Sequence, residues 1–252
     1  MARKYPPARW RPIERNFTNR VRTETRGVIL HSTGSATATS QFGWFNNPAA
    51  DASSHLHLDV KGRWEQYVDL DKIAWTSGAG NTTTIGVETQ GDGTTAWNDA
   101  QVLALVRFLR WAAKKYRFPL RTMSSSLPTQ TGVGTHRLGV RGNFPTRGVQ
   151  RGLIQRGKGE QWSSDFGKVC PGDKRQAQWP DIVRAAQRHR VVLPTLGRTG
   201  AATYLVPETG KKNLSRVLTV GRIIRISEFH GKWALTAHGD WIKRSKIKGK
   251  KP

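Results

Sequence analysis

Short apolar runs in the first half of the chain predict the strands of a β-sheet. Residues Gly27–His31 form a continuous apolar run that ends in a histidine, which is typical of a strand buried on both faces. Residues 54–60 alternate between apolar and polar, and together with residues 63–68 they predict a β-hairpin with one polar face. Thr83–Glu88 is rich in β-branched residues and predicts a further strand.

The helices are fewer and are predicted from the spacing of apolar residues. Apolar positions three and four apart predict one long helix over Asp99–Tyr116, with Asn98 placed to cap its first turn. A second helix is predicted over residues 179–189, because Pro180 is favoured in a first helical turn. A short helix is expected over Gln41–Phe45.

Two stretches lack a clear period and are predicted to be loops. Residues 73–78 should form a loop that carries an exposed aromatic residue, Trp75. Residues 137–167 are rich in Gly, Arg and Gln, and they predict a long loop.

The composition along the chain predicts four parts. Residues 1–24 are rich in Arg, Pro and Asn and should form an irregular N-terminal arm on the main domain, residues 25–190. Residues 191–203 read as a linker, and residues 204–252 as a small all-β domain with a basic tail. Closely spaced strands without a helix favour a barrel there; they are predicted at 214–218, 222–227, 232–236 and 241–243.

The charge of the chain is its most unusual bulk property. The 252 residues carry a net charge of +25, and a charge of this size favours a polyanionic partner. Nucleic acid and the anionic polymers and peptide carboxylates of a bacterial wall both fit, and the charge alone does not choose between them.

The ends and the hydropathy of the chain give two negative expectations. No run of 18 or more apolar residues is present, so no membrane insertion is expected. Met1–Pro7 is basic but precedes no apolar core, so we expect no secretory signal peptide and synthesis in the cytoplasm.

The single cysteine, Cys170, is the first candidate for chemistry. A lone cysteine cannot form an internal disulfide, so it is a buried small hydrophobe, a reactive thiol or a metal ligand. Lys168 lies two residues before it and a Pro-Gly turn follows it. Partners for a metal site would be histidines on other segments, and His31 and His136 stand out.

Five fragments carry a resemblance to a known family, in the order in which that family has them. They are Val28–Thr33, Ser54–Leu56, Ile85–Glu88, Gly134–His136 and Lys168–Gly172. With them, residues 25–190 resemble zinc N-acetylmuramoyl-L-alanine amidases of the amidase-2 or peptidoglycan-recognition type, which include phage endolysins. The C-terminal part is similar to a bacterial SH3-type wall-binding domain, by its strand pattern and its Gly-Asp-Trp-Ile-Lys ending.

The resemblance implies a fold and a set of site residues. The fold would be α/β, with a central mixed β-sheet flanked by helices, followed by a small SH3-like barrel. His31, His136 and Cys170 would bind Zn²⁺ and leave a fourth position open, as catalytic zinc sites do. Glu88 would act as the base, and Lys168 would stabilise the oxyanion.

His55 and Trp75 are expected to line the substrate site, and each has an alternative interpretation. A histidine on a hairpin is more often packed and hydrogen-bonded than a ligand, which also applies to His57. Trp75 could equally cap the core, Glu88 could be a surface carboxylate, and Lys168 could be one more solvated lysine.

The chain departs from the family at three places. Ser54 stands where some relatives have a tyrosine, so the role of base would fall to Glu88 alone. Thr76 follows Trp75 where the family often has a histidine. The stretch from His136 to Cys170 is longer than usual, so its extra basic loop either shapes substrate binding or puts the second ligand in doubt.

Three functions follow from these observations. The first is an endolysin, a monomer made in a host cytoplasm and released through a holin-type pore, which cleaves the amide between N-acetylmuramic acid and L-alanine in the wall. The second is a peptidoglycan-recognition protein of the same fold without catalysis, although such proteins typically lose the cysteine ligand. The third is a nucleic-acid-binding protein; because no known nucleic-acid motif is present, we expect no nucleic-acid partner.

Overall fold

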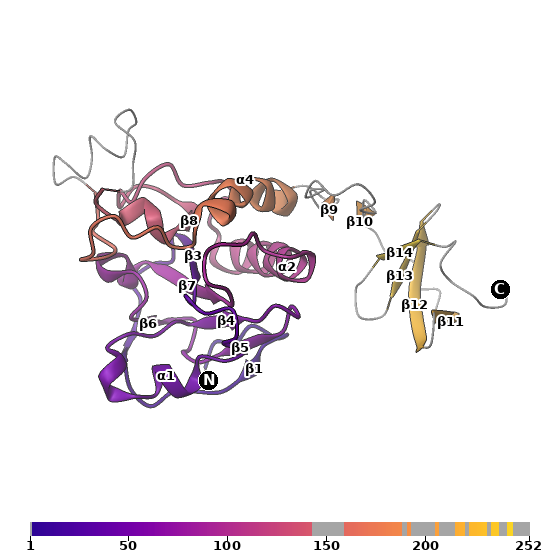
Figure 1. Ribbon diagram of the computed structural model, residues 1–252, viewed down its shortest axis with the longest axis horizontal. Helices are drawn as coiled ribbons and strands as arrows, with labels where there is room; N and C mark the ends of the chain where they lie inside the picture. The colour runs from indigo at the N-terminus through magenta and orange to yellow at the C-terminus, as the bar shows by residue number, and fades with distance from the viewer. Residues whose placement is uncertain are drawn as a thin grey trace. The chain divides into compact units, whose positions relative to one another are not determined.

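A computed structural model describes residues 2–142 and 159–187, and beyond these the backbone of six short strands between residues 191 and 243. The chain forms two compact units, Met1–Gln187 and Arg188–Pro252 (Figure 1). The first unit holds the site described below.

The first unit is built on a six-stranded mixed sheet, as the resemblance implies. The strand order is β1-β5-β4-β7-β3-β8. Strands β4, β7, β3 and β8 are parallel to one another, whereas β5 is antiparallel to β4 and β1 is parallel to β5. The bounds are β1 Arg9–Trp10, β3 Gly27–Ser32, β4 Leu56–Leu58, β5 Trp64–Gln66, β7 Thr84–Thr89 and β8 Gly132–Thr135.

Strand β3 lies inside the sheet and is covered on both faces, which explains its continuous apolar run. Helices α2 (Asp99–Tyr116) and α4 (Asp173–Gln187) pack against each other and cover one face of the sheet (Figure 1). Two short 3-10 helices also contact the sheet: η2 (Gly78–Thr82) contacts β7, and η3 (His136–Gly139) contacts β3. Val28, Ile29 and Leu30 are consequently fully buried.

Helix α2 has the bounds that the sequence predicts, and its cap explains where it begins. The Asn98 side chain accepts from the Gln101 N–H, and the Gln101 side chain accepts from the Asn98 N–H, which forms a capping box. Lys114 and Lys115 lie in the last turn, where positive charge stabilises the helix dipole. Arg117 ends the helix in the left-handed conformation.

The sequence suggested that the N-terminal residues form an irregular arm, but the structure shows strands there. Strand β1 pairs with β5, and β2 (Phe17–Val21) pairs with β6 (Lys72–Ala74), whose last two residues lie inside the predicted 73–78 loop. Both are edge pairings, and most β2 side chains are exposed. Because an exposed edge strand needs no apolar period, neither strand could be recognised from the pattern of apolar residues. Near them lie α1 (Phe42–Phe45), close to the predicted short helix, and the 3-10 helix η1 (Pro48–Ala50).

Two further predictions need correction. Helix α4 begins at Asp173, six residues before the predicted start, and holds Pro180 in its interior. A turn centred on Cys170-Pro171 precedes it, and the proline pattern favoured the wrong starting residue. The hairpin β4–β5 is confirmed, but its polar face is not solvated, since His55 and His57 are both fully buried.

The second unit contains the four strands predicted in its sequence. They form one antiparallel sheet in chain order: β11 Ser215–Thr219, β12 Arg222–His230, β13 Trp233–Thr236 and β14 Trp241–Lys243. The expected linker holds a strand, because β9 (Val191–Val192) pairs with β10 (Leu205–Val206). The SH3-like barrel stays a prediction, and the basic tail and residues 143–158 of the long loop lie outside the described residues.

Within the part of the chain that the structure describes, no helix has the length and apolar character needed to cross a bilayer.

The capping box of α2 gives a first prediction. Asn98→Ala removes the oxygen that accepts from the Gln101 N–H, so we expect the free energy of unfolding to fall by about 1 kcal/mol in urea denaturation. Asn98→Asp is the matched control. It keeps a capping oxygen, but like Asn98→Ala it loses the hydrogen bond that the Asn98 side-chain NH₂ donates to the Val60 carbonyl. Equal losses in the two variants would show that the cap is not the cause.

Candidate metal centre

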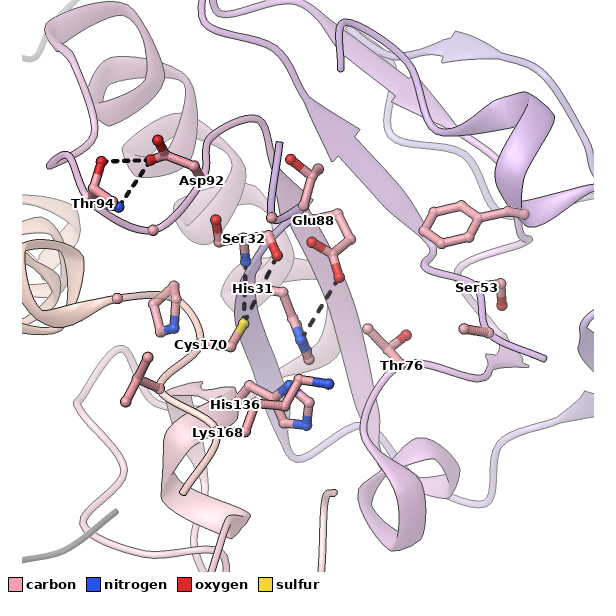
Figure 2. A pocket seen from close by; sticks show the side chains of 18 of the residues that line it. His31, Ser32, Ser53, Thr76, Glu88, Asp92, Thr94, His136, Lys168 and Cys170 are labelled. Atoms are coloured by element: carbon pink, nitrogen blue, oxygen red, sulfur yellow. Dashed lines mark hydrogen bonds and ion pairs between the residues drawn. The ribbon is translucent and has the colours of Figure 1, made fainter. Parts of the chain in front are cut away.

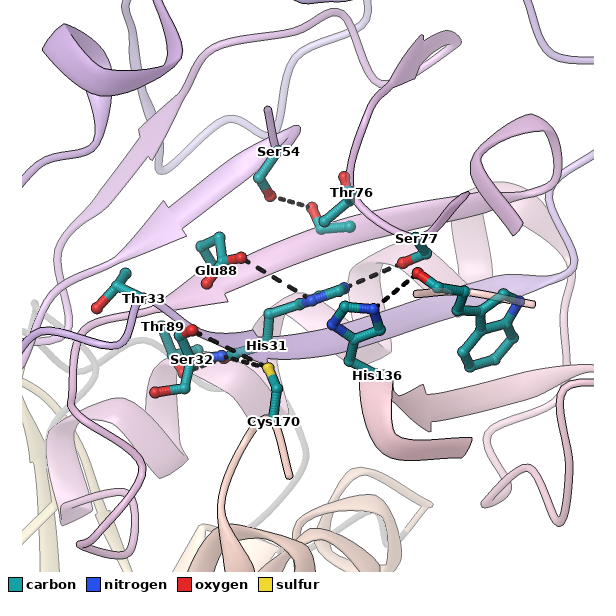
Figure 3. Close-up of polar contacts among 12 residues, drawn as sticks. His31, Ser32, Thr33, Ser54, Thr76, Ser77, Glu88, Thr89, His136 and Cys170 are labelled. Carbon is teal, nitrogen blue, oxygen red and sulfur yellow. Dashed lines mark hydrogen bonds and ion pairs between the residues drawn. The ribbon is translucent and has the colours of Figure 1, made fainter. Parts of the chain in front are cut away.

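The carboxyl ends of three parallel strands bring the main candidate residues together. His31 lies near the end of β3, Glu88 near the end of β7, and His136 directly follows β8. His31 and Glu88 are direct neighbours in the register of β3 and β7. Parallel strands end at the same edge of a sheet, so residues more than 100 positions apart in the sequence meet there (Figures 2 and 3).

Cys170 completes the cluster from the segment that precedes α4. Its sulfur accepts a hydrogen bond of 3.3 Å from the Ser32 N–H at the end of β3. One potential ligand atom from each of His31, His136 and Cys170 lies within 4.8 Å of the others, and Figure 3 shows the three side chains pointing toward one another. Two imidazole nitrogens and one sulfur are a donor set that suits Zn²⁺, with a fourth position left for a reactant.

Hydrogen bonds to one nitrogen of each imidazole orient the rings. His136 Nε2 lies 2.8 Å from the Trp162 carbonyl oxygen, which can only accept, so Nε2 carries the proton and Nδ1 keeps its lone pair. His31 Nε2 lies 3.1 Å from Ser77 Oγ, and the two ring centroids are 4.5 Å apart. Each ring therefore has its Nδ1 free of these bonds and available to a shared ion.

Burial keeps both histidines neutral, which is the state that binds a metal. The pKa of His136 is lowered to about 4, first by burial. The pKa of His31 is lowered well below its usual value by burial, then by His136 and Lys168. Burial and then Glu88 raise the pKa of the Cys170 thiol to about 12, so a bound cation would have to displace its proton.

Glu88 has the properties of a general base at neutral pH. Burial raises the pKa of its carboxyl group to about 7, although Lys168 and Arg175 oppose the shift. Its Oε1 lies 3.9 Å from His31 Nδ1, and its buried Oε2 has no hydrogen-bond partner among the described residues. An unsatisfied buried oxygen beside the three ligand candidates fits a site that is completed by an ion or a reactant.

A pocket of about 520 Å³ opens over the cluster, and Figure 2 shows the side chains that line it. The three ligand candidates and Glu88 lie in its lining, together with Lys168 and Trp75. Lys168 also pairs with Asp165 at 3.1 Å, and the Trp75 indole N–H donates to Thr18 Oγ1 at 3.0 Å. The structure thus brings six of the seven predicted site residues to one cavity.

His55 is the exception, so its expected place in the substrate site is corrected. It is fully buried and does not line the pocket. Its Nδ1 accepts from the Gly86 N–H at 3.0 Å, and its Nε2 lies 3.0 Å from the Lys72 carbonyl oxygen. Burial and then Arg22 lower its pKa to about 3, so His55 is a neutral residue that joins β6 and β7. Ser54 is also turned inward, donating to the Gly86 carbonyl at 2.9 Å.

The residues that orient the three ligand candidates could not be recognised from the sequence. Ser77 and the Trp162 carbonyl orient the histidines, and the Ser32 N–H supports the sulfur. Arg175 is almost fully buried and donates to Ser32 Oγ and to the Gln90 carbonyl, which joins α4 to the ends of β3 and β7. A backbone carbonyl has no sequence signal, and Arg175 is one of 42 basic residues, so nothing in the pattern marked it.

Fold and site together define an α/β protein in which His31, His136 and Cys170, three candidate metal ligands, meet at an open pocket. Residues 21–173 match the Amidase_2 family model, described as N-acetylmuramoyl-L-alanine amidase, over more than half of the chain. The chain therefore belongs to this family, and its function is that of a peptidoglycan hydrolase of the amidase type.

The chain is also similar to several solved structures. N-acetylmuramoyl-L-alanine amidase LysC from Clostridium intestinale has 10% identity and a TM-score of 0.45, with 71% of this chain and 97% of that chain covered. The PlyG catalytic domain has 16% identity and a TM-score of 0.49, with coverages of 76% and 99%. A mutant endolysin from Bacillus subtilis has 18% identity and a TM-score of 0.46, with coverages of 69% and 95%. No curated protein sequence matches the chain.

The buried carboxyl group of Glu88 predicts a pH dependence of stability in the metal-free protein. Its pKa is 4.5 when unfolded and about 7 when folded, so the folded state holds the proton more tightly. The free energy of unfolding should fall as the pH rises between these values, by about 3 kcal/mol, and should then level off.

Glu88→Gln lacks this titration and tests the prediction. Urea denaturation of the metal-free wild type and of Glu88→Gln from about pH 4 to about pH 8, a range that includes both pKa values of Glu88, gives the difference between their pH profiles. We expect the variant to gain stability relative to wild type as the pH rises. Parallel profiles would contradict a raised pKa of Glu88.

Proposed function

We propose that the chain cleaves the amide bond between N-acetylmuramic acid and L-alanine at a Zn²⁺ centre held by His31, His136 and Cys170. The observation that carries the proposal is the convergence of these three donors beside an unsatisfied buried Glu88 carboxylate. When bound, Zn²⁺ supplies Lewis acidity that polarises a carbonyl and acidifies water. The donor set matches this ion, because soft sulfur and imidazole ligands favour zinc over magnesium or calcium.

Glu88 moves the proton in this mechanism. In the metal-free protein burial raises its pKa to about 7, and a pKa near neutral suits a group that first accepts and later donates a proton. The carboxylate takes a proton from the attacking water and delivers it to the nitrogen of the leaving L-alanine. Glu88 lines the pocket from the strand next to His31, which supports this role.

Lys168 and the pocket walls supply charge stabilisation and orientation. The Lys168 ammonium lies in the pocket lining, and it would stabilise the negative oxygen that develops on the scissile carbonyl. Trp75 offers an aromatic wall, and its indole N–H is fixed by Thr18, which holds the ring in one orientation for a substrate.

We further propose that the protein is a phage endolysin, made in the host cytoplasm and released to the wall through a holin-type pore. A net charge of +25 would hold it on anionic wall polymers, and the second unit would add wall binding as an SH3-like domain. We expect a monomer, since cleavage needs only the residues of one chain.

Metal analysis of the purified full chain tests the centre. We expect one zinc ion per wild-type chain and much less in His31→Ala, His136→Ala and Cys170→Ser, because each variant removes one of three ligands. His238→Ala, a histidine of the second unit, is the control and should keep its zinc. Full occupancy in the His136 variant would remove that residue from the site.

Turnover of isolated walls tests the chemistry. A chelator should abolish the release of L-alanine amino groups, and added zinc should restore it. Glu88→Gln should keep its zinc but lose roughly 10²–10⁴-fold in kcat, because only the proton transfer is removed. Wall binding without any release of amino groups would instead favour a recognition protein of the same fold.

A further inference from the structure

The segment Glu160–Trp162 belongs to the long stretch between His136 and Cys170, and it is tied to the metal centre. The Trp162 N–H donates to the Gly139 carbonyl at 2.9 Å, and the Gln161 carbonyl accepts from the Ala79 N–H at 3.1 Å. The segment therefore binds both η2 and η3. The Trp162 carbonyl is the group that accepts from His136 Nε2, at 2.8 Å.

The Trp162 side chain is locked in place, which fixes its carbonyl. The indole is almost fully buried, and it fits only because two neighbours are glycines. A Cβ at Gly139 would lie 2.3 Å from Trp162 Cγ, and a Cβ at Gly80 would lie 2.6 Å from Trp162 Nε1. Side-chain carbons do not approach so closely, so the ring occupies a slot made for it.

An ion pair between the buried Arg26 and the partly exposed Glu160 holds the other end of the segment. Glu160 Oε2 accepts from the Trp162 indole N–H at 3.0 Å and pairs with the Arg26 guanidinium. Arg26 donates in addition to Thr83 Oγ1 at 2.8 Å and to the Gln130 carbonyl at 3.3 Å, and its side chain is only 2% exposed. Arg26 directly precedes β3, the strand that carries His31 near its other end.

We infer that Arg26, Glu160 and Trp162 are positioning residues for His136, and that they select its metal-binding tautomer. The chain of contacts runs from the Arg26 guanidinium to Glu160, from Glu160 to the indole N–H, and from the Trp162 carbonyl to His136 Nε2. With Nε2 protonated, Nδ1 is the nitrogen left to bind an ion. The inference rests on the proposed zinc centre, and it gives the extra stretch of this chain a role at the second ligand.

The purely structural alternative makes a different prediction. If the ion pair between Arg26 and Glu160 only stabilised the fold, its loss would lower the free energy of unfolding without changing the affinity for zinc. Groups that bind the second ring nitrogen of a ligand histidine typically change metal affinity by about 10–100-fold. Zinc affinity and stability therefore separate the two roles.

Three variants of the full chain make the test. Glu160→Leu removes the acceptor for the indole N–H, whereas Glu160→Gln keeps an oxygen there but loses the charge that faces Arg26. Arg22→Met is the matched control, since Arg22 is also a buried arginine that donates to the Lys72 and Leu70 carbonyls, away from the three ligand candidates. If Glu160→Leu fails to fold, Trp162→Phe replaces it, because it removes the same indole N–H.

Zinc dissociation constants from competition with a chromophoric chelator give the first readout. We expect binding to weaken by about 10-fold or more in Glu160→Leu, and much less in Glu160→Gln and Arg22→Met, although both lose stability. Unchanged affinity in Glu160→Leu, or an equal loss in Arg22→Met, would overturn the inference.

The nitrogen chemical shifts of His136 in the metal-free protein give a second readout that does not depend on zinc. Wild type should show a protonated Nε2 and a bare Nδ1, and Glu160→Leu should show a mixture of tautomers. Absence of zinc binding by wild type would refute the proposed function. A wild-type mixture of tautomers would refute the positioning role by itself.

Discussion

The parallel pairing of β3 with β7 and β8 is the constraint on which the site depends. The register sets His31 beside Glu88 on β7, and it sets Leu30 beside Thr135, so that His136 emerges next to the same strand end. A slip of one residue would turn each of these side chains to the opposite face of the sheet. The register is held by burial, because Val28, Leu30, Ile85 and Val133 have no exposed surface and fit only one alignment.

Burial also gives the polar residues at the strand ends their chemical character. Removal from water keeps His31 and His136 neutral and raises the pKa of Glu88 to about 7. A protein interior without a bound ion would be more stable with apolar residues than with neutral imidazoles, a thiol and a carboxyl oxygen that has no hydrogen bond. They are consistent with a centre whose folded form is completed by a cation, as in other enzymes where local stability is reduced for function.

Much of this arrangement could be predicted from the sequence, and the exceptions have definite physical causes. The apolar run of β3 and the helical spacing of apolar residues in α2 were sufficient to locate both elements. A strand buried on both faces is apolar throughout, and a helix buried along one side has apolar residues three and four positions apart. Strands β1 and β2 show no such apolar pattern, because edge strands are stabilised by backbone pairing that many residue types can make. His55 was misplaced for a related reason: its ring serves the backbone of β7 rather than the pocket.

The sequence by itself determined the chemical inventory: one sulfur, a histidine that ends an apolar strand, a glutamate that ends another, and a large positive charge. Order along the chain and resemblance to a family were enough to propose which of these residues belong together. Only the tertiary structure decided which nitrogen of each imidazole is free, which carboxylate is desolvated, and that a chain of contacts from Arg26 through Glu160 and Trp162 ends at His136. These properties depend on backbone carbonyls, on solvent exclusion and on contacts between distant segments, and none of them is a property of a residue in isolation.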